Sequence, residues 1–232
     1  MIVVTGATGQ LGRLVIAQLL ARGVAPSGIV AAVRQPSKAA DLAAGGGVVR
    51  EADYARPQTL GPALADAKRL LLISSSEVGQ RLTQHRAVVE AAREARVPQL
   101  VYTSLLRADS TPLGLGAEHR ETEALIAASG LPHVLLRNGW YTENYLASVP
   151  AARQHGVFIG SAGEGRIASA TRADYAAAAA AVLTQPIAGN RTFELAGDSG
   201  YTLAEFVAEL NRQAGSAVRY QDLPQAAFAA AL

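Results

Sequence analysis

The feature that most constrains the fold is a glycine-rich turn close to the first residue. Residues 6–12 read Gly-Ala-Thr-Gly-Gln-Leu-Gly and directly follow the β-branched run of residues 2–5. From Gln10 to Arg22, leucine and valine recur at helical spacing. A buried strand, glycines three residues apart and an amphipathic helix indicate a βαβ dinucleotide-binding unit, in which the helix start faces a pyrophosphate. A glycine turn that is structural only is the alternative.

Strand-like and helix-like segments alternate along the first 136 residues. Predicted strands cover residues 2–5, 28–33, 48–49, 70–73, 100–103 and 133–136, and predicted helices cover 10–22, 36–44, 58–67, 81–96 and 118–129. Short connections and strict alternation predict an α/β fold of Rossmann type, a doubly wound parallel sheet with helices on both faces.

After residue 138 this alternation loosens. We expect a helix over 140–153, short strands at 157–159 and 166–168, a helix over 171–183, a strand at 192–195, a helix over 203–214 and a strand at 217–220. The sequence therefore predicts a Rossmann domain over residues 1–137. A smaller C-terminal substrate-binding lobe over residues 138–232 is expected to fold against it.

Ligands of a doubly wound sheet bind beyond the carboxyl ends of its strands. At the end of the second strand, NAD-binding proteins usually carry Asp or Glu for the ribose 2′-hydroxyl, but this chain carries Arg34. An arginine fork suits a 2′-phosphate and predicts NADPH as the cofactor, unless Arg34 is a solvated surface residue. Three serines after the fourth strand can line the same groove, or they form an ordinary turn. The candidate cofactor-binding residues are Gly6, Ala7, Thr8, Gly9, Gln10, Leu11, Arg34, Ser74, Ser75 and Ser76.

Composition excludes several classes of protein. With no cysteine there is no disulfide scaffold, thiol nucleophile or cysteine-ligated zinc, and the four histidines lack metal-ligand spacing. A net charge of +2 with scattered arginines argues against a nucleic-acid partner. The longest apolar run, residues 176–183, is too short to cross a bilayer, and the start lacks a signal peptide. We therefore expect a cytoplasmic protein without membrane insertion.

Several catalytic motifs are also missing. No tyrosine precedes Lys38 or Lys68 by four residues, which excludes dehydrogenases and epimerases that need such a pair. There is no Gly-x-Ser-x-Gly elbow and no Walker lysine loop. His85 is interpreted as a packed structural histidine. His119, among the glutamates of residues 118–123, is interpreted as part of a solvated helix face.

Five stretches together resemble one family. They are Gly-Ala-Thr-Gly-Gln-Leu-Gly at 6–12, Leu-Leu-Ile-Ser-Ser-Ser-Glu-Val-Gly-Gln at 71–80, Tyr-Thr-Ser-Leu-Leu at 102–106, Leu-Leu-Arg-Asn-Gly-Trp-Tyr at 135–141 and Ala-Thr-Arg-Ala-Asp-Tyr at 170–175. Over essentially the whole chain, the sequence resembles the bacterial type 2 NADPH:quinone oxidoreductases, which are NmrA-like atypical short-chain dehydrogenases. The resemblance implies an enzyme that reduces a small-molecule quinone with NADPH and without flavin. It also implies that the candidate cofactor-binding residues named above hold NADPH.

The resemblance further implies a quinone pocket lined by Asn138, Gly139, Trp140, Tyr141, Thr142 and Glu143. Asn138 and Tyr141 are the candidate donors to the developing oxyanion, whereas the residues identify no proton donor and set no oligomeric state. Trp140 offers an aromatic face to the substrate or serves as a core anchor. The alternative function is an NADP(H)-sensing regulator of NmrA type without catalysis. Because family members continue for several dozen residues, we expect the C-terminal lobe to be truncated.

Overall fold

The computed structural model describes residues 1–231. The chain divides into two compact units. The first unit contains Met1–Asn138 and Arg172–Leu195, and the second contains Gly139–Thr171 and the residues from Ala196 onward. The first stretch of unit one ends at Asn138, next to the boundary expected after residue 137, and residues 172–195, expected in the C-terminal lobe, return to unit one.

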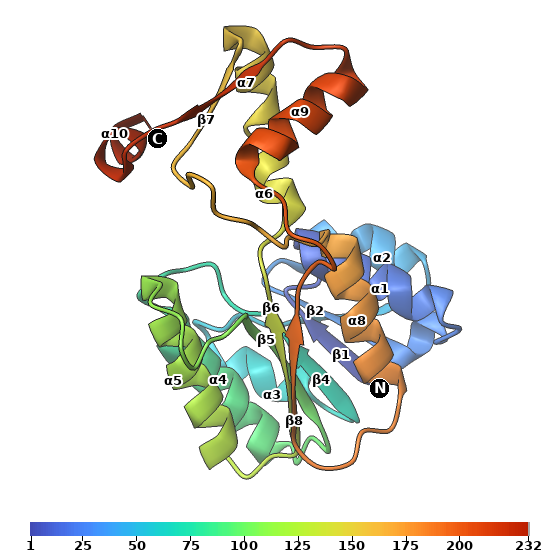
Figure 1. The fold of residues 1–232 in the computed structure, drawn as a ribbon. Coiled ribbons are helices and arrows are strands. Elements are labelled where there is room, and N and C mark those ends of the chain that lie inside the picture. Colours follow the sequence, from blue (N-terminus) through green and yellow to red (C-terminus); the bar gives the residue numbers. More distant parts are fainter. Residues whose placement is uncertain (232) are drawn as a thin grey trace. The chain divides into compact units, whose positions relative to one another are not determined.

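The first unit is built on a parallel sheet of seven strands (Figure 1). The strands are β1 (Ile2–Thr5), β2 (Ile29–Val33), β3 (Val48–Glu51), β4 (Arg69–Leu72), β5 (Leu100–Leu105), β6 (His133–Asn138) and β8 (Arg191–Leu195). Their order is β3-β2-β1-β4-β5-β6-β8, and every neighbouring pair is parallel. The predicted Rossmann-type sheet is therefore confirmed, and the strand order reverses between β1 and β4.

Helices cover both faces of this sheet. They are α1 (Gln10–Ala21), α2 (Ala40–Ala44), α3 (Leu60–Ala63), α4 (Arg81–Glu94), α5 (Gly114–Ala128) and α8 (Arg172–Thr184), with short 3-10 turns at Pro26–Gly28, Pro36–Ala39 and Pro57–Thr59. Helices α1 and α8 pack together on one face, and α3, α4 and α5 lie on the other (Figure 1). This division follows from right-handed crossovers on either side of the reversal point.

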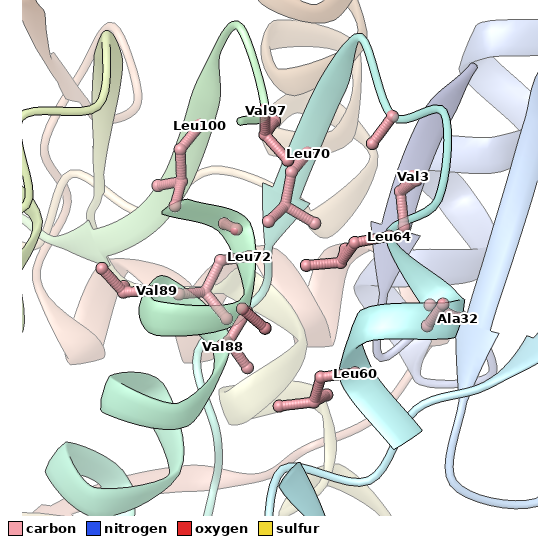
Figure 2. Packing of buried hydrophobic residues seen from close by; sticks show 14 of the residues in the cluster. Val3, Ala32, Leu60, Leu64, Leu70, Leu72, Val88, Val89, Val97 and Leu100 are labelled. Atoms are coloured by element: carbon pink, nitrogen blue, oxygen red, sulfur yellow. The ribbon is translucent and has the colours of Figure 1, made fainter. Parts of the chain in front are cut away.

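The core lies between the sheet and helices α3 and α4. Figure 2 shows strand residues meeting helix residues there, namely Val3, Ala32, Leu70, Leu72 and Leu100 against Leu60, Leu64, Val88 and Val89. All five residues of β2 are buried, as expected for a strand covered on both faces. Burying each valine or leucine side chain contributes roughly 1.5–3 kcal/mol, so this packing contributes strongly to the stability of the sheet.

The second unit is smaller. Its elements are α6 (Thr142–Leu146), α7 (Val149–His155), β7 (Val157–Gly160), α9 (Leu203–Ala214), β9 (Arg219–Asp222) and α10 (Gln225–Ala231). Strands β7 and β9 pair in parallel, and α9 starts with a capping box between Thr202 and Glu205. A small core of Ala152, Phe158, Val207 and Val218 joins these elements.

Three predictions for the part of the chain after residue 138 differ from the structure. The helix expected over 140–153 is interrupted, because α6 ends at Leu146 and α7 starts again with a proline in its first turn. Residues 166–168 form no strand and contribute one isolated bridge, between Ile167 and Tyr201. Residues 172–195 belong to the sheet unit because β8 pairs with β6 and α8 packs against α1.

Candidate functional site

The glycine turn after β1 has the backbone geometry that its spacing predicts. Gly6 has a φ of +59°, a conformation that glycine adopts without strain, and the Gly9 N–H closes the turn on the Gly6 carbonyl at 2.9 Å. A Cβ on Gly12 would lie 2.4 Å from the Gly6 carbonyl oxygen and 2.7 Å from Ala7 Cα. The first glycine thus permits the turn, and the third lets α1 pack directly against it.

The start of α1 is suited to an anion. Gly9 is its N-cap, no side chain caps it, and its first turn contains no acidic residue. The first N–H groups of a helix lack partners within the helix, and the helix dipole adds positive potential there. Together with the exposed Gly9, these groups form the kind of cradle that binds a pyrophosphate.

Arg34 lies at the same edge of the sheet, immediately after β2, which neighbours β1. Its side chain is 69% exposed, and its Nη1 lies 2.9 Å from Glu77 Oε1. The next carboxylate along the chain, Asp41, is bound instead by Arg13 at 2.6 Å, and this hydrogen bond lowers the pKa of Asp41. Asp41 is therefore not positioned to act as a ribose-binding carboxylate at the end of β2.

The segment Ser74–Ser76 follows β4, on the other side of β1. The Ser74 N–H donates to Thr103 Oγ1 at 2.9 Å, and the Ser75 carbonyl accepts from Arg81 Nε at 2.8 Å. The hydroxyls of Ser74 and Ser76 make no hydrogen bond within residues 1–231. The backbone of this segment is therefore fixed by the protein, while two hydroxyls stay available to a ligand.

His85, on α4, also holds the backbone of Ser74–Ser76. Its Nε2 accepts from the Ser75 N–H at 2.9 Å, and its Nδ1 lies 3.0 Å from the Thr122 hydroxyl. Since that hydroxyl donates to the Glu118 carbonyl, Nδ1 must carry the proton and the ring is neutral. Burial lowers the pKa of His85 to about 3. The prediction of a packed structural histidine is confirmed.

The interpretation of His119 as part of a solvated face is wrong. His119 is buried, and its Nδ1 lies 2.8 Å from the Tyr102 hydroxyl. Burial lowers the pKa of His119 to about 4. The expected helix started at Glu118, but α5 starts at Gly114, and its spacing turns His119, Thr122 and Glu123 toward the sheet.

These two neutral histidines predict a loss of stability in mild acid. Their folded pKa values lie below the unfolded value of about 6.5, so the unfolded chain binds more protons as the pH falls below that value. We expect the free energy of unfolding to fall by about 1.5 kcal/mol per histidine between roughly pH 6.5 and 5. Urea denaturation at several pH values measures this slope.

Two variants test whether His119 causes this pH dependence of the free energy of unfolding. His119→Gln is expected to reduce the slope by about half, because His85 still contributes, whereas His155→Gln, at an exposed site, is expected to leave it unchanged. Equal slopes in the parent and in His119→Gln would show that His119 titrates normally in the folded state.

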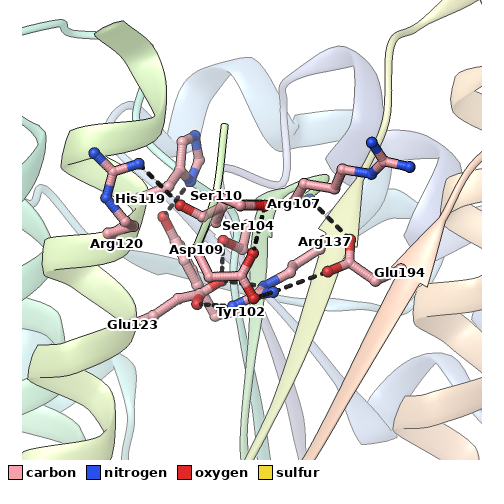
Figure 3. Close-up of polar contacts among 11 residues, drawn as sticks. Tyr102, Ser104, Arg107, Asp109, Ser110, His119, Arg120, Glu123, Arg137 and Glu194 are labelled. Atoms are coloured by element: carbon pink, nitrogen blue, oxygen red, sulfur yellow. Dashed lines mark hydrogen bonds and ion pairs between the residues drawn. The ribbon is translucent and has the colours of Figure 1, made fainter. Parts of the chain in front are cut away.

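An ionic cluster lies near the carboxyl ends of β5, β6 and β8 (Figure 3). Arg137, on β6, donates from Nε and Nη2 to the two carboxylate oxygens of Glu123 at 2.9 and 2.7 Å. Its Nη1 reaches Asp109 and Glu194, each at 2.8 Å, and the Ser104 hydroxyl donates to Glu123 at 2.5 Å. These hydrogen bonds raise the pKa of Arg137, with that to Glu123 contributing most. The cluster fixes the strand end that leads into Asn138.

Sequence reasoning gave this cluster no role, although one signal was present. Arg137 is the only charged residue in the strand His133–Asn138, all of which is buried. A buried guanidinium requires carboxylate partners, so a search for glutamates on the packing helix could have found Glu123.

The candidate quinone-binding residues continue from the end of β6. Asn138 is buried, and its carbonyl accepts from the Leu106 N–H at 2.9 Å. In the second unit, the Thr142 N–H donates to the Ala170 carbonyl at 3.0 Å, which anchors the start of α6. Trp140 is 48% exposed, with its ring 6.2 Å from that of Tyr145. This exposure does not fit the alternative role of Trp140 as a core anchor.

Other features of the described chain lie away from this edge. A cavity of about 440 Å³ lies at the amino ends of β1 and β4, where Arg22, Lys68 and Arg69 line it. It is on the wrong edge for a Rossmann-type ligand. Among residues 1–231, no group of histidine and acidic side chains could hold a metal ion, and no helix is long and apolar enough to span a membrane.

Comparisons with known proteins agree with this geometry. A family model described as NAD(P)H-binding matches residues 6–186. The chain is 59% identical over 232 residues to Quinone oxidoreductase 2 of Escherichia coli strain K12, covering 100% of this chain and 81% of that protein. It is 31% identical to an NmrA-like family domain-containing oxidoreductase of Aspergillus flavus, over 93% of this chain and 72% of that protein. The chain belongs to the NmrA-like, NAD(P)H-binding oxidoreductases.

Solved structures of related oxidoreductases show the same fold. The E. coli NADPH-dependent quinone oxidoreductase QOR2 in complex with NADPH superposes with a TM-score of 0.96 at 59% identity, covering 100% of this chain and 82% of that one. The Citrobacter sp. triphenylmethane reductase complexed with NADP(H) gives a TM-score of 0.91 at 38% identity, covering 96% and 79%. Both structures are named for binding the dinucleotide that the glycine turn and Arg34 predict.

Proposed function

We propose that the protein reduces quinones with NADPH by direct hydride transfer, without flavin. The observation that carries this proposal is the identity of 59% along the whole chain to Quinone oxidoreductase 2 of E. coli. Such a reaction would use a cytoplasmic pool of NADPH, in keeping with the expected location.

The segments that follow β1, β2 and β4 at the carboxyl ends of these strands, here called the cofactor edge, fit NADPH. Gly6 to Leu11 would place backbone N–H groups and the positive end of α1 against the pyrophosphate. Arg34, exposed beyond β2, would bind the 2′-phosphate, and the Ser74 and Ser76 hydroxyls would line the groove. When bound, NADPH supplies the hydride.

The segment from Asn138 to Glu143 would bind the quinone, with the second unit serving as the substrate lobe. It combines an amide, two aromatic side chains and hydroxyl groups, which suits a flat aromatic dicarbonyl. Asn138 and Tyr141 would donate hydrogen bonds to the oxygen on which negative charge develops. Because a quinone is already electrophilic, positioning and charge stabilisation suffice, and no nucleophilic side chain is needed.

Loss of either donor is expected to slow turnover. Asn138→Ala and Tyr141→Phe should each lower quinone turnover by about tenfold, less than the 10²–10³-fold known for preorganised oxyanion donors, and leave NADPH affinity within about threefold. The absorbance of the reduced nicotinamide, followed with a simple benzoquinone, measures the rate.

Tyr145→Phe is the matched control, because Tyr145 lies in the aromatic cluster of the second unit and its hydroxyl makes no hydrogen bond within residues 1–231. If Asn138→Ala and Tyr141→Phe both reduced quinone at the rate of the parent protein, this segment would not be the substrate site. NADPH binding without turnover in the parent protein would instead support the NADP(H)-sensing regulator.

A further inference from the structure

Glu77 occupies a distinctive place at the cofactor edge. It follows the Ser74–Ser76 segment after β4, while Arg34 follows β2, and β1 lies between these two strands. The ion pair between Arg34 and Glu77, at 2.9 Å, therefore joins the segments on either side of the strand that carries the glycine turn. No carboxylate other than Glu77 pairs with Arg34 within residues 1–231.

The Glu77 carboxylate is held in this direction from its other side. Gln84, buried on α4, donates from Nε2 to Glu77 Oε2 at 2.7 Å. The Glu77 N–H donates to Ser75 Oγ at 3.1 Å, which fixes the backbone of the same residue. One carboxylate oxygen of Glu77 is thus bound by the buried Gln84 and the other by Arg34. The hydrogen bond from Gln84 therefore holds the Glu77 carboxylate in position to pair with Arg34.

We propose that Glu77 competes with the 2′-phosphate of the dinucleotide for Arg34 and so limits the preference for NADPH over NADH. This inference rests on the proposed binding of NADPH at this edge. A 2′-phosphate that reaches the Arg34 guanidinium must displace the Glu77 carboxylate or bind beside it, and both cost free energy. A dinucleotide with a 2′-hydroxyl leaves the ion pair intact.

The exposure of the pair sets the size of the effect. The side chains of Arg34 and Glu77 are 69% and 45% exposed, so water and salt screen their attraction. Exposed ion pairs contribute about 0.2–1 kcal/mol, which corresponds to at most about a fivefold change in affinity. Glu77→Gln is therefore expected to lower the Kd for NADPH by about 1.4- to fivefold and to leave the Kd for NADH unchanged.

Calorimetric titration of the parent protein and four variants tests this proposal: Glu77→Gln, Glu90→Gln, Arg34→Ala, and Arg34→Ala combined with Glu77→Gln. Glu90→Gln is the matched control, because it removes the same charge from an exposed position on α4 that has no ion pair in the described chain. In an Arg34→Ala background, Glu77→Gln should no longer improve NADPH binding, because competition acts through the guanidinium.

Three results would overturn the proposal. An unchanged or weaker NADPH affinity in Glu77→Gln would show that Glu77 does not compete. An equal gain in Glu90→Gln would indicate a general charge effect, and an equal gain in the Arg34→Ala background would indicate direct repulsion of the phosphate. The parent protein separates this outcome from the proposed function: NADPH binding and quinone turnover there, with no response to Glu77→Gln, refute the competition alone.

Discussion

Replacing Arg34 by alanine is expected to weaken NADPH binding by about 10- to 150-fold and to leave NADH affinity nearly unchanged. A charge-assisted hydrogen bond to a phosphate contributes roughly 1.5–3 kcal/mol, which gives this range. The side chain is exposed and, within residues 1–231, forms an ion pair with Glu77 alone, so the fold should tolerate the change. Calorimetric titration with the two dinucleotides measures both affinities.

Arg86→Ala is the appropriate control, because Arg86 is exposed on α4 and the change removes the same charge. If Arg34→Ala weakened both dinucleotides alike, Arg34 would not bind the 2′-phosphate. If Arg86→Ala weakened NADPH equally, the effect would come from net charge.

Glu123→Ala is expected to destabilise the protein by about 3 kcal/mol. Removing one partner of a buried ion pair typically costs 3–5 kcal/mol, since the other charge stays buried. Arg137 would keep Asp109 and Glu194 but lose the two hydrogen bonds to Glu123, which places the effect at the lower end. Urea denaturation above pH 7 measures it without interference from the histidines.

Two further variants test the cause. Glu121→Ala, at an exposed position of α5, should change the stability by less than about 0.5 kcal/mol. Glu123→Gln keeps the shape without the charge and should fall between the two. Equal stabilities of Glu123→Ala and Glu121→Ala would mean that the cluster does not support the sheet.

The sequence predicted the structure best where a backbone conformation can be adopted by only one type of residue. The spacing of Gly6 and Gly12 predicted a tight turn and a close helix contact, and both are present. The alternation of apolar strands and amphipathic helices predicted the parallel sheet and its two covered faces. These features depend on residues that are close along the chain, which is why the pattern alone was sufficient.

Features that depend on distant residues were not predicted. The partners of Arg137 lie 14, 28 and 57 positions away along the chain, and only the fold brings them together. The pairing of Glu77 with Arg34, 43 residues apart, arises in the same way. The burial of His119 was missed because the face of α5 that meets the sheet carries the polar side chains of His119, Thr122 and Glu123, whereas a buried helix face is expected to be apolar.

The placement of β8 at the end of the sheet has a consequence for synthesis on the ribosome. Asn138 and Leu195 are register partners, so the last ladder of the sheet cannot close until residue 195 has left the exit tunnel. Helix α8, which is tied to the sheet unit by Arg22 and Arg69 through its carbonyls, emerges at the same late stage. Until then, β6 is an edge strand with unpaired backbone groups, and such edges favour pairing with other chains. Nascent chains from which β6 has emerged but residue 195 has not are therefore expected to expose an edge that can pair with other chains.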